Sequence, residues 1–191
     1  MSLAGAERSA PAIIQIGTSM DELQRCLGCG ALLPQSDGPT HPYLGASAAC
    51  WAVYGEVLAR EYGEYRYPPF HRLTVDAYSV QHPGTPSRRS IQSVAVHLVS
   101  LHLVLERGYS SEQATEGIRR ALGHRQDFVW LEPPASLGDL TILDVRDSAD
   151  YSQHEAMVKR WAESVWQAWS PHHGTVRRWA ACELLVEGDV T

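Results

Sequence analysis

The chain has 191 residues, 44% of them hydrophobic and 20% charged, with a formal net charge of −6 at pH 7. This composition is typical of a globular protein that is large enough to bury a core without disulfide staples. The acidic balance provides no broad basic surface and therefore disfavours nucleic-acid binding. No apolar stretch reaches the ~18 residues of a membrane span. The four cysteines, in a chain that opens without a signal-peptide pattern, favour reduced thiols or metal ligands and a cytoplasmic location.

The chain begins with a segment of weak pattern, followed by a stretch rich in turn residues. We expect residues 1–20 to form a loose N-terminal arm and residues 21–191 a single helical domain. Residues 26–45 contain four glycines and three prolines, too many for a helix or a strand. The sequence therefore predicts a loop here that something must fix in place, and we assign residues 26–50 as a metal-binding loop.

Helical patterns follow in order along the rest of the chain. Ser47 can cap the first predicted helix, which ends at Gly63. The segment 88–106 is apolar on nearly all sides, so we expect it to be the central and most buried helix. Ser110 and Gln113 form a capping box, and Ser170 with Pro171 predicts the start of the last helix. The remaining predicted helices cover 67–82 and 149–169.

Two short segments near the middle of the chain have the composition of strands. They are "DFVWL" at 127–131 and "DLTILDV" at 139–145, separated by a linker that contains Pro-Pro and glycine. The predicted fold class is therefore mainly α. We expect a compact helical domain with an N-terminal zinc-knuckle-like loop and a small two-stranded β element.

Three of the four cysteines and one histidine lie in the loop region. "CLGCG" places two residues between Cys26 and Cys29, and His41 and Cys50 follow. Thiolates and imidazole are the ligands that zinc prefers, and four of them complete a tetrahedral site. Cys50 lies in the first turn of its predicted helix, where the helix dipole favours a thiolate. The sequence thus predicts zinc as the cofactor, bound by Cys26, Cys29, His41 and Cys50.

The nine histidines are more than a chain of this length usually contains, and they leave several assignments open. His71, Tyr78 and His82 share one side of a predicted helix. Asp76 lies four residues after Arg72, which favours a surface ion pair. Any of five histidines can join a metal or polar site: His82, His97, His102, His172 and His173.

Two functional hypotheses follow from these residues. In the first, the zinc is structural and the helical domain has a binding or regulatory role, with a small molecule or a protein as partner. In the second, Cys26, Cys29 and His82 hold zinc with an activated water in a small hydrolase-like metalloenzyme, and Asp76 or His71 acts as base. No HExxH, deaminase or G-x-S-x-G motif supports the second hypothesis.

Several long blocks of the sequence carry a family resemblance. They are "CLGCGA", "DGPTHPYLGAS", "CWAVYGEVLAREY", "HRLTVDAYSVQHPG" and "SVAVHLVSLHLVLERG". These blocks resemble an uncharacterised bacterial family of unknown function, most clearly over residues 26–108. The resemblance implies a bacterial source and implies no activity or substrate.

Overall fold

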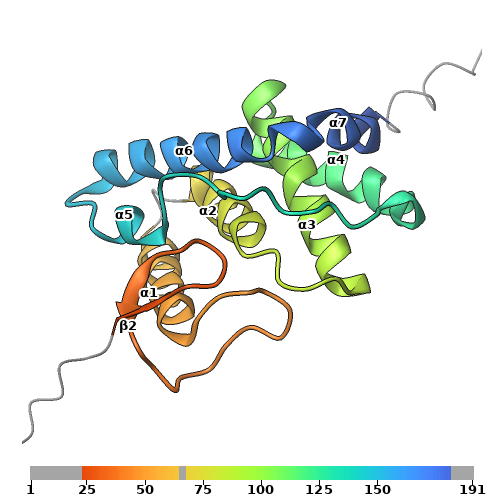
Figure 1. The fold of residues 1–191 in the computed structure, drawn as a ribbon. Coiled ribbons are helices and arrows are strands. Elements are labelled where there is room, and N and C mark those ends of the chain that lie inside the picture. Colours follow the sequence, from red (N-terminus) through yellow and green to blue (C-terminus); the bar gives the residue numbers. More distant parts are fainter. Residues whose placement is uncertain (1–22, 65–67, 182–191) are drawn as a thin grey trace, which may run out of the picture.

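The computed structural model describes residues 23–64 and 68–181. The predicted N-terminal arm, residues 1–20, lies outside the described residues, as does Cys182. Within the described part, seven α-helices and one two-stranded sheet account for the regular structure (Figure 1). The elements in chain order are β1 (Leu23–Arg25), β2 (Leu32–Pro34), α1 (Ala48–Gly63), α2 (Pro68–Gln81), α3 (Arg88–Leu101), a π-helical turn (His102–Glu106), α4 (Ser111–Gly123), a 3-10 turn (Arg125–Asp127), α5 (Ile142–Arg146), α6 (Tyr151–Ala168), a second 3-10 turn (Ser170–His172) and α7 (His173–Ala181).

Helix α2 lies at the centre of the helical body, where it packs against both α3 and α6 (Figure 1). The sequence predicted α3 for this place, and Leu98 and Leu101 on that helix are indeed fully buried. The central position of α2 escaped prediction because it buries polar side chains as well as apolar ones. Gln81, for example, is buried and donates to the Leu137 and Leu140 carbonyls. Hydrogen bonds of this kind allow a polar helix face to be buried.

The mainly helical fold class is confirmed, but the strands lie elsewhere than predicted. β1 and β2 pair antiparallel on either side of the Cys26–Cys29 turn, with Arg25 opposite Leu32. The segment predicted as a second strand forms α5 instead. Thr141 caps this helix and Asp144 completes a capping box, a local signal that overrides the strand propensity of its apolar residues. The 127–131 segment forms no strand.

Two of the three predicted helix-capping residues are confirmed and one is wrong. Ser47 and Ser110 accept backbone N–H bonds at the starts of α1 and α4. Ser170 makes no capping bond; it begins a 3-10 turn, and α7 starts at His173. No helix in the described ranges is long and apolar enough to span a membrane.

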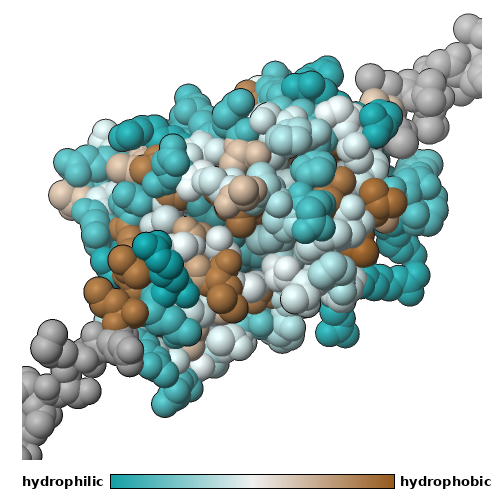
Figure 2. Space-filling model, viewed as in Figure 1, coloured by the Kyte–Doolittle hydropathy of each residue, from teal (hydrophilic) through white to brown (hydrophobic). Residues whose placement is uncertain are grey.

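The β hairpin leaves most of its large apolar side chains in solvent. Leu23, Leu27 and Leu32 are 60%, 89% and 48% exposed. Figure 2 shows apolar surface gathered at this corner of the molecule, beside the point where the described chain begins. Leu33 is the leucine of the hairpin that enters the core. Burial alone therefore gives the hairpin little stability.

Candidate metal centre

Four side chains from three segments of the chain converge beneath the hairpin. Cys26 and Cys29 lie on the turn between β1 and β2, Cys50 lies in the first turn of α1, and His82 directly follows α2. One ligand atom from each residue can be chosen so that all four lie within 4.8 Å of one another. The group is a Cys3His set of the kind that could hold a metal ion.

The distances within the group agree with a tetrahedral ion. The Sγ atoms of Cys29 and Cys50 are 3.8 Å apart, and Cys50 Sγ lies 3.4 Å from His82 Nε2. A zinc ion at ordinary bond lengths places two sulfurs about 3.8 Å apart and a sulfur and a nitrogen about 3.6 Å apart. These two separations are close to the edges of a zinc tetrahedron, and all four ligand atoms lie within 4.8 Å of one another.

The turn that carries the first two cysteines is shaped by its backbone and its glycines. Cys26 N–H donates to the Ala31 carbonyl at 2.9 Å, and Gly30 N–H donates to the Cys26 carbonyl at 3.0 Å. Gly30 has a φ of 73°, a conformation that L side chains rarely adopt. A Cβ atom on Gly28 would lie 2.4 Å from His82 Cδ2. Glycine is therefore needed where the turn approaches the histidine.

Neighbouring groups orient the ligand atoms. His82 Nδ1 lies 2.8 Å from the Tyr78 carbonyl, so the ring donates there and presents Nε2 to the cysteines. The Tyr78 hydroxyl donates to Cys50 Sγ at 3.6 Å, and the Ser47 N–H donates to Cys26 Sγ at 3.4 Å. Such outer hydrogen bonds fix the tautomer and the orientation of metal ligands.

The electrostatics of the group favour a thiolate. Hydrogen bonds from Cys29 and Cys50 hold the pKa of Cys26 far below its usual range. The same contact with Cys26 raises the pKa of Cys50, so the two neighbouring thiols do not both ionise. Burial lowers the pKa of His82, but hydrogen bonds with Cys26 and Cys29 outweigh it and raise this pKa to about 9. A divalent cation would displace these protons, and its affinity would rise with pH.

The structure brings three of the four predicted ligands together and places the fourth elsewhere. Cys26, Cys29 and Cys50 belong to the group, whereas His41 lies beside it. The His41 ring packs against Tyr43 at 4.3 Å and Trp51 at 5.0 Å between centroids. Burial lowers the pKa of His41. His82, which the sequence placed in the enzyme hypothesis, stands in the fourth position.

The other histidines have partners outside the metal group. His71 and His154 both donate to the buried carboxylate of Glu61, at 2.6 and 2.8 Å. His102 donates to Glu106 at 2.9 Å. The bonds to Glu61 join α2 and α6 to α1, whereas the bond from His102 to Glu106 lies within the π-helical turn.

The two C-terminal histidines bind backbone carbonyls. His173 stacks on Trp166 with ring centroids 3.8 Å apart and lies 2.9 Å from the carbonyl of the same residue. His172 lies 2.8 Å from the Glu132 carbonyl. These contacts attach α7 and its preceding turn to the rest of the body.

Comparison with known protein families gives a match. The model of a family of unknown function, DUF5946, matches residues 24–170. This range includes all four members of the Cys3His group. No curated protein and no solved structure matches the chain.

Proposed function

We propose that this chain, which belongs to the DUF5946 family, binds one zinc ion through Cys26, Cys29, Cys50 and His82, and that the zinc is structural. The observation that carries the proposal is the convergence of four ligand atoms, three sulfurs and one imidazole nitrogen, within 4.8 Å of one another. The helical body that the zinc supports would then have a binding or regulatory role.

The donor set favours zinc over other common ions. Three sulfurs and one imidazole suit zinc, whereas calcium and magnesium require oxygen ligands. No carboxylate belongs to the group. Three free cysteines in the described part of the chain also suit a reducing compartment such as the cytoplasm.

Four protein ligands support a structural role rather than a catalytic one. A catalytic zinc usually keeps a position open for water, whereas structural sites are closed by four protein groups. Cys50 and His82 are fully buried and Cys26 is 2% exposed, whereas Cys29 is partly exposed, so three of the four ligands are closed to water. A zinc ion here would tie the hairpin to the start of α1 and the end of α2.

The loop after the hairpin also docks at this point. Gly45 N–H donates to the His82 carbonyl at 3.1 Å. A Cβ atom on Gly84 would lie 2.3 Å from the Tyr43 carbonyl oxygen, which shows how closely the two segments approach. A metal that fixes His82 would therefore fix the docking site of this loop as well.

Chelator competition on purified protein tests the ligand set. We expect His82→Ala and Cys50→Ser to weaken zinc binding by more than the ~10- to 100-fold typical of losing an outer hydrogen-bond partner. His41→Ala is the matched control, because it removes a neighbouring imidazole outside the group, and it should leave zinc affinity unchanged. Failure of the wild type to bind zinc, or an equal loss in His41→Ala, would overturn the assignment.

Cobalt substitution separates the structural proposal from the enzyme hypothesis. Cobalt in a closed Cys3His site should give intense tetrahedral visible bands together with sulfur-to-metal charge transfer. A site of Cys26, Cys29 and His82 with a bound water would keep its spectrum when Cys50 becomes serine, and would change when an anion such as azide replaces the water. Either of these results would favour the metalloenzyme.

A further inference from the structure

A cavity of about 350 Å³ opens along α3, and none of the metal-binding residues lines it. It is bordered by the loop that follows the hairpin and by one face of the helix. The lining residues are Tyr43, Arg89, Gln92, Ser93, Val96 and His97.

A buried carboxylate orients the imidazole in this cavity. His97 Nδ1 lies 2.8 Å from Asp76 Oδ1, and the Ser100 hydroxyl donates to the other oxygen of Asp76. Asp76 is only 1% exposed, so the predicted surface ion pair with Arg72 is wrong. Arg72 reaches the Ser100 hydroxyl at 3.4 Å instead. Both oxygens of the carboxylate are therefore held in place.

This arrangement sets the tautomer of the ring. A carboxylate that accepts from Nδ1 leaves Nε2 of His97 as a hydrogen-bond acceptor. Nε2 makes no hydrogen bond within the described part of the chain, and the ring is 23% exposed. Burying a carboxylate is costly unless its partners compensate. A buried acid that holds a partly exposed imidazole against a cavity is an arrangement by which proteins position a proton acceptor.

Arg89 supplies a positive charge to the same cavity. Its side chain is exposed and forms no salt bridge with the described residues. Gln92 adds an amide, and Tyr43 adds a ring that comes from the loop docked beside His82. A ligand here would meet a cation, an amide and an oriented acceptor.

We propose that this cavity binds a small oxyanion that carries a neighbouring hydroxyl group, with Arg89 as counter-ion and the hydroxyl donating to His97 Nε2. The shared chemistry is that of a hydroxy acid or a phosphate ester of an alcohol. This inference goes beyond the zinc site, because it needs neither a metal nor any of the four cluster residues.

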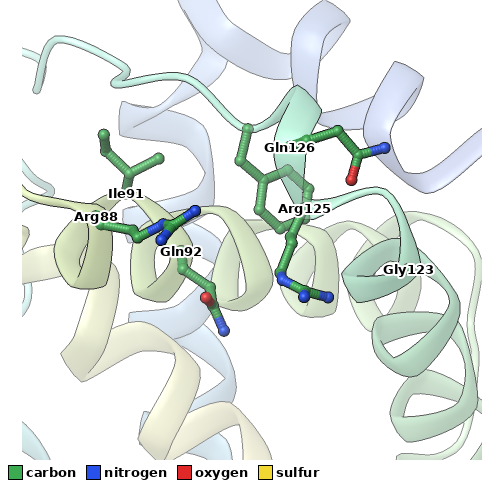
Figure 3. Close-up of a pocket in the computed structure, with 7 residues that line it drawn as sticks. Arg88, Ile91, Gln92, Gly123, Arg125 and Gln126 are labelled. Atoms are coloured by element: carbon green, nitrogen blue, oxygen red, sulfur yellow. The ribbon is translucent and has the colours of Figure 1, made fainter.

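A second cavity beside it provides an internal control. It has a volume of about 520 Å³ and adjoins the first at Gln92. In Figure 3, Arg88 and Gln92 extend from α3 and Arg125 from the turn after α4. It offers positive charge but no imidazole, so it has no acceptor for a hydroxyl group.

The test uses zinc-loaded protein with labelled histidine, and follows the His97 ring by NMR. Glycolate is titrated against acetate, which lacks the hydroxyl, and glycerol phosphate is titrated in parallel. We expect glycolate or glycerol phosphate to bind with millimolar affinity and glycolate to bind at least several-fold more tightly than acetate. Arg89→Ala should weaken binding about tenfold, while Arg125→Ala should leave it unchanged.

His97→Phe should bring glycolate and acetate to equal affinity, because it keeps an aromatic ring but removes the acceptor nitrogen. Zinc content and near-UV circular dichroism show whether each variant folds. If His97→Phe does not fold, the effects of Arg89→Ala and Arg125→Ala and the ratio of glycolate to acetate affinity in the wild type still decide. The proposal is overturned if neither hydroxyl-bearing anion binds below about 10 mM. It is also overturned if acetate matches glycolate in the wild type, or if Arg125→Ala is the variant that weakens binding.

Discussion

The hairpin and the helical body are stabilised by different means. The two strands have three residues each, and three hairpin leucines remain in solvent. In the body, Trp161, Trp169 and Leu98 have no exposed surface. The body is held by burial of large apolar side chains, whereas the hairpin meets it through Leu33 and the Cys3His group.

This difference indicates what a metal would contribute. A two-stranded hairpin is marginally stable by itself in water. Coordination bonds can replace a hydrophobic core over a short segment, as in small zinc-dependent domains. The body is large enough to fold by burial. The two regions should therefore respond differently to loss of metal and to loss of core volume.

Removal of zinc should have the largest effect, on the hairpin and on the loop docked at His82. Zinc binding contributes on the order of 10 kcal/mol in small zinc modules. After chelation we expect the amides of Cys26 and Gly30, which form the turn hydrogen bonds, to lose protection from hydrogen exchange. Amides in α6 should keep theirs. Simultaneous loss of protection in α6 would show that the two regions are not separate in stability.

Truncation of a core leucine should destabilise the helical body, whereas truncation of a hairpin leucine should not. Leu98→Ala should cost about 2–5 kcal/mol of unfolding free energy, because Leu98 is fully buried. Leu27→Ala is the matched change in the hairpin, where the side chain is 89% exposed, and should cost almost nothing. Urea denaturation of the zinc-loaded proteins measures both. Similar losses in the two variants would contradict the contrast.

Replacing a glycine by alanine should have opposite effects in the two regions. Gly28→Ala brings a Cβ atom to 2.4 Å from His82 Cδ2 and should lower zinc affinity by the equivalent of about 2 kcal/mol. Gly55→Ala in α1 meets no heavy atom within 4 Å and should stabilise the body by about 0.5–1 kcal/mol. Chelator competition and thermal unfolding measure the two effects. Unchanged zinc affinity in Gly28→Ala would mean that the turn can move away from the histidine.

Acid should weaken the contact between Glu106 and Arg177 in the helical body, with a smaller effect on stability than the changes above. The bidentate hydrogen bonds from Arg177, with a further bond from His102, lower the pKa of Glu106 to about 2. Because the folded pKa lies below the unfolded one, this stabilisation is present above about pH 4.5 and is lost as the pH falls toward 2. Its size should be about 1 kcal/mol after solvent screening.

Comparison with Glu106→Gln isolates this contribution. The difference in unfolding free energy between the two proteins cancels any loss of zinc in acid. We expect that difference to shrink between about pH 4.5 and pH 2. A difference that does not change over this range would show that the carboxylate is not preferentially ionised in the folded protein.

The sequence predicted those parts of the fold that have local signals. Ser47 and Ser110 indicated the starts of two helices, and the apolar periodicity predicted α3 and α6. The strand prediction failed at 139–145 because a capping box outweighed β propensity. The central place of α2 was missed because Thr74, Asp76 and Gln81 are buried polar residues whose partners lie far along the chain.

The sequence predicted the kinds of residue in the candidate site, but it did not predict which histidine completes the site. A CxxC pair and a cysteine at a helix start can be identified from spacing alone. The choice between His41 and His82 depends on how α2 packs, which no local spacing determines. The sequence "QHPG" was the local signal that favoured His82. Pro83 and Gly84 end the helix directly after this histidine. Asp76 was misplaced for the same reason, since its partners His97 and Ser100 belong to α3.

The wide separation of the Cys3His residues along the chain has a consequence for biosynthesis. Cys26 and Cys29 leave the ribosome first, then Cys50, and His82 only after the whole of α2 has been made. Until that moment the nascent thiols can hold an ion only incompletely, and they are open to oxidation and to competing thiophilic metals. With the proposed four ligands, stable zinc loading would require that α1 and α2 have been synthesised and docked, so a bound ion would mark a chain that has completed this step.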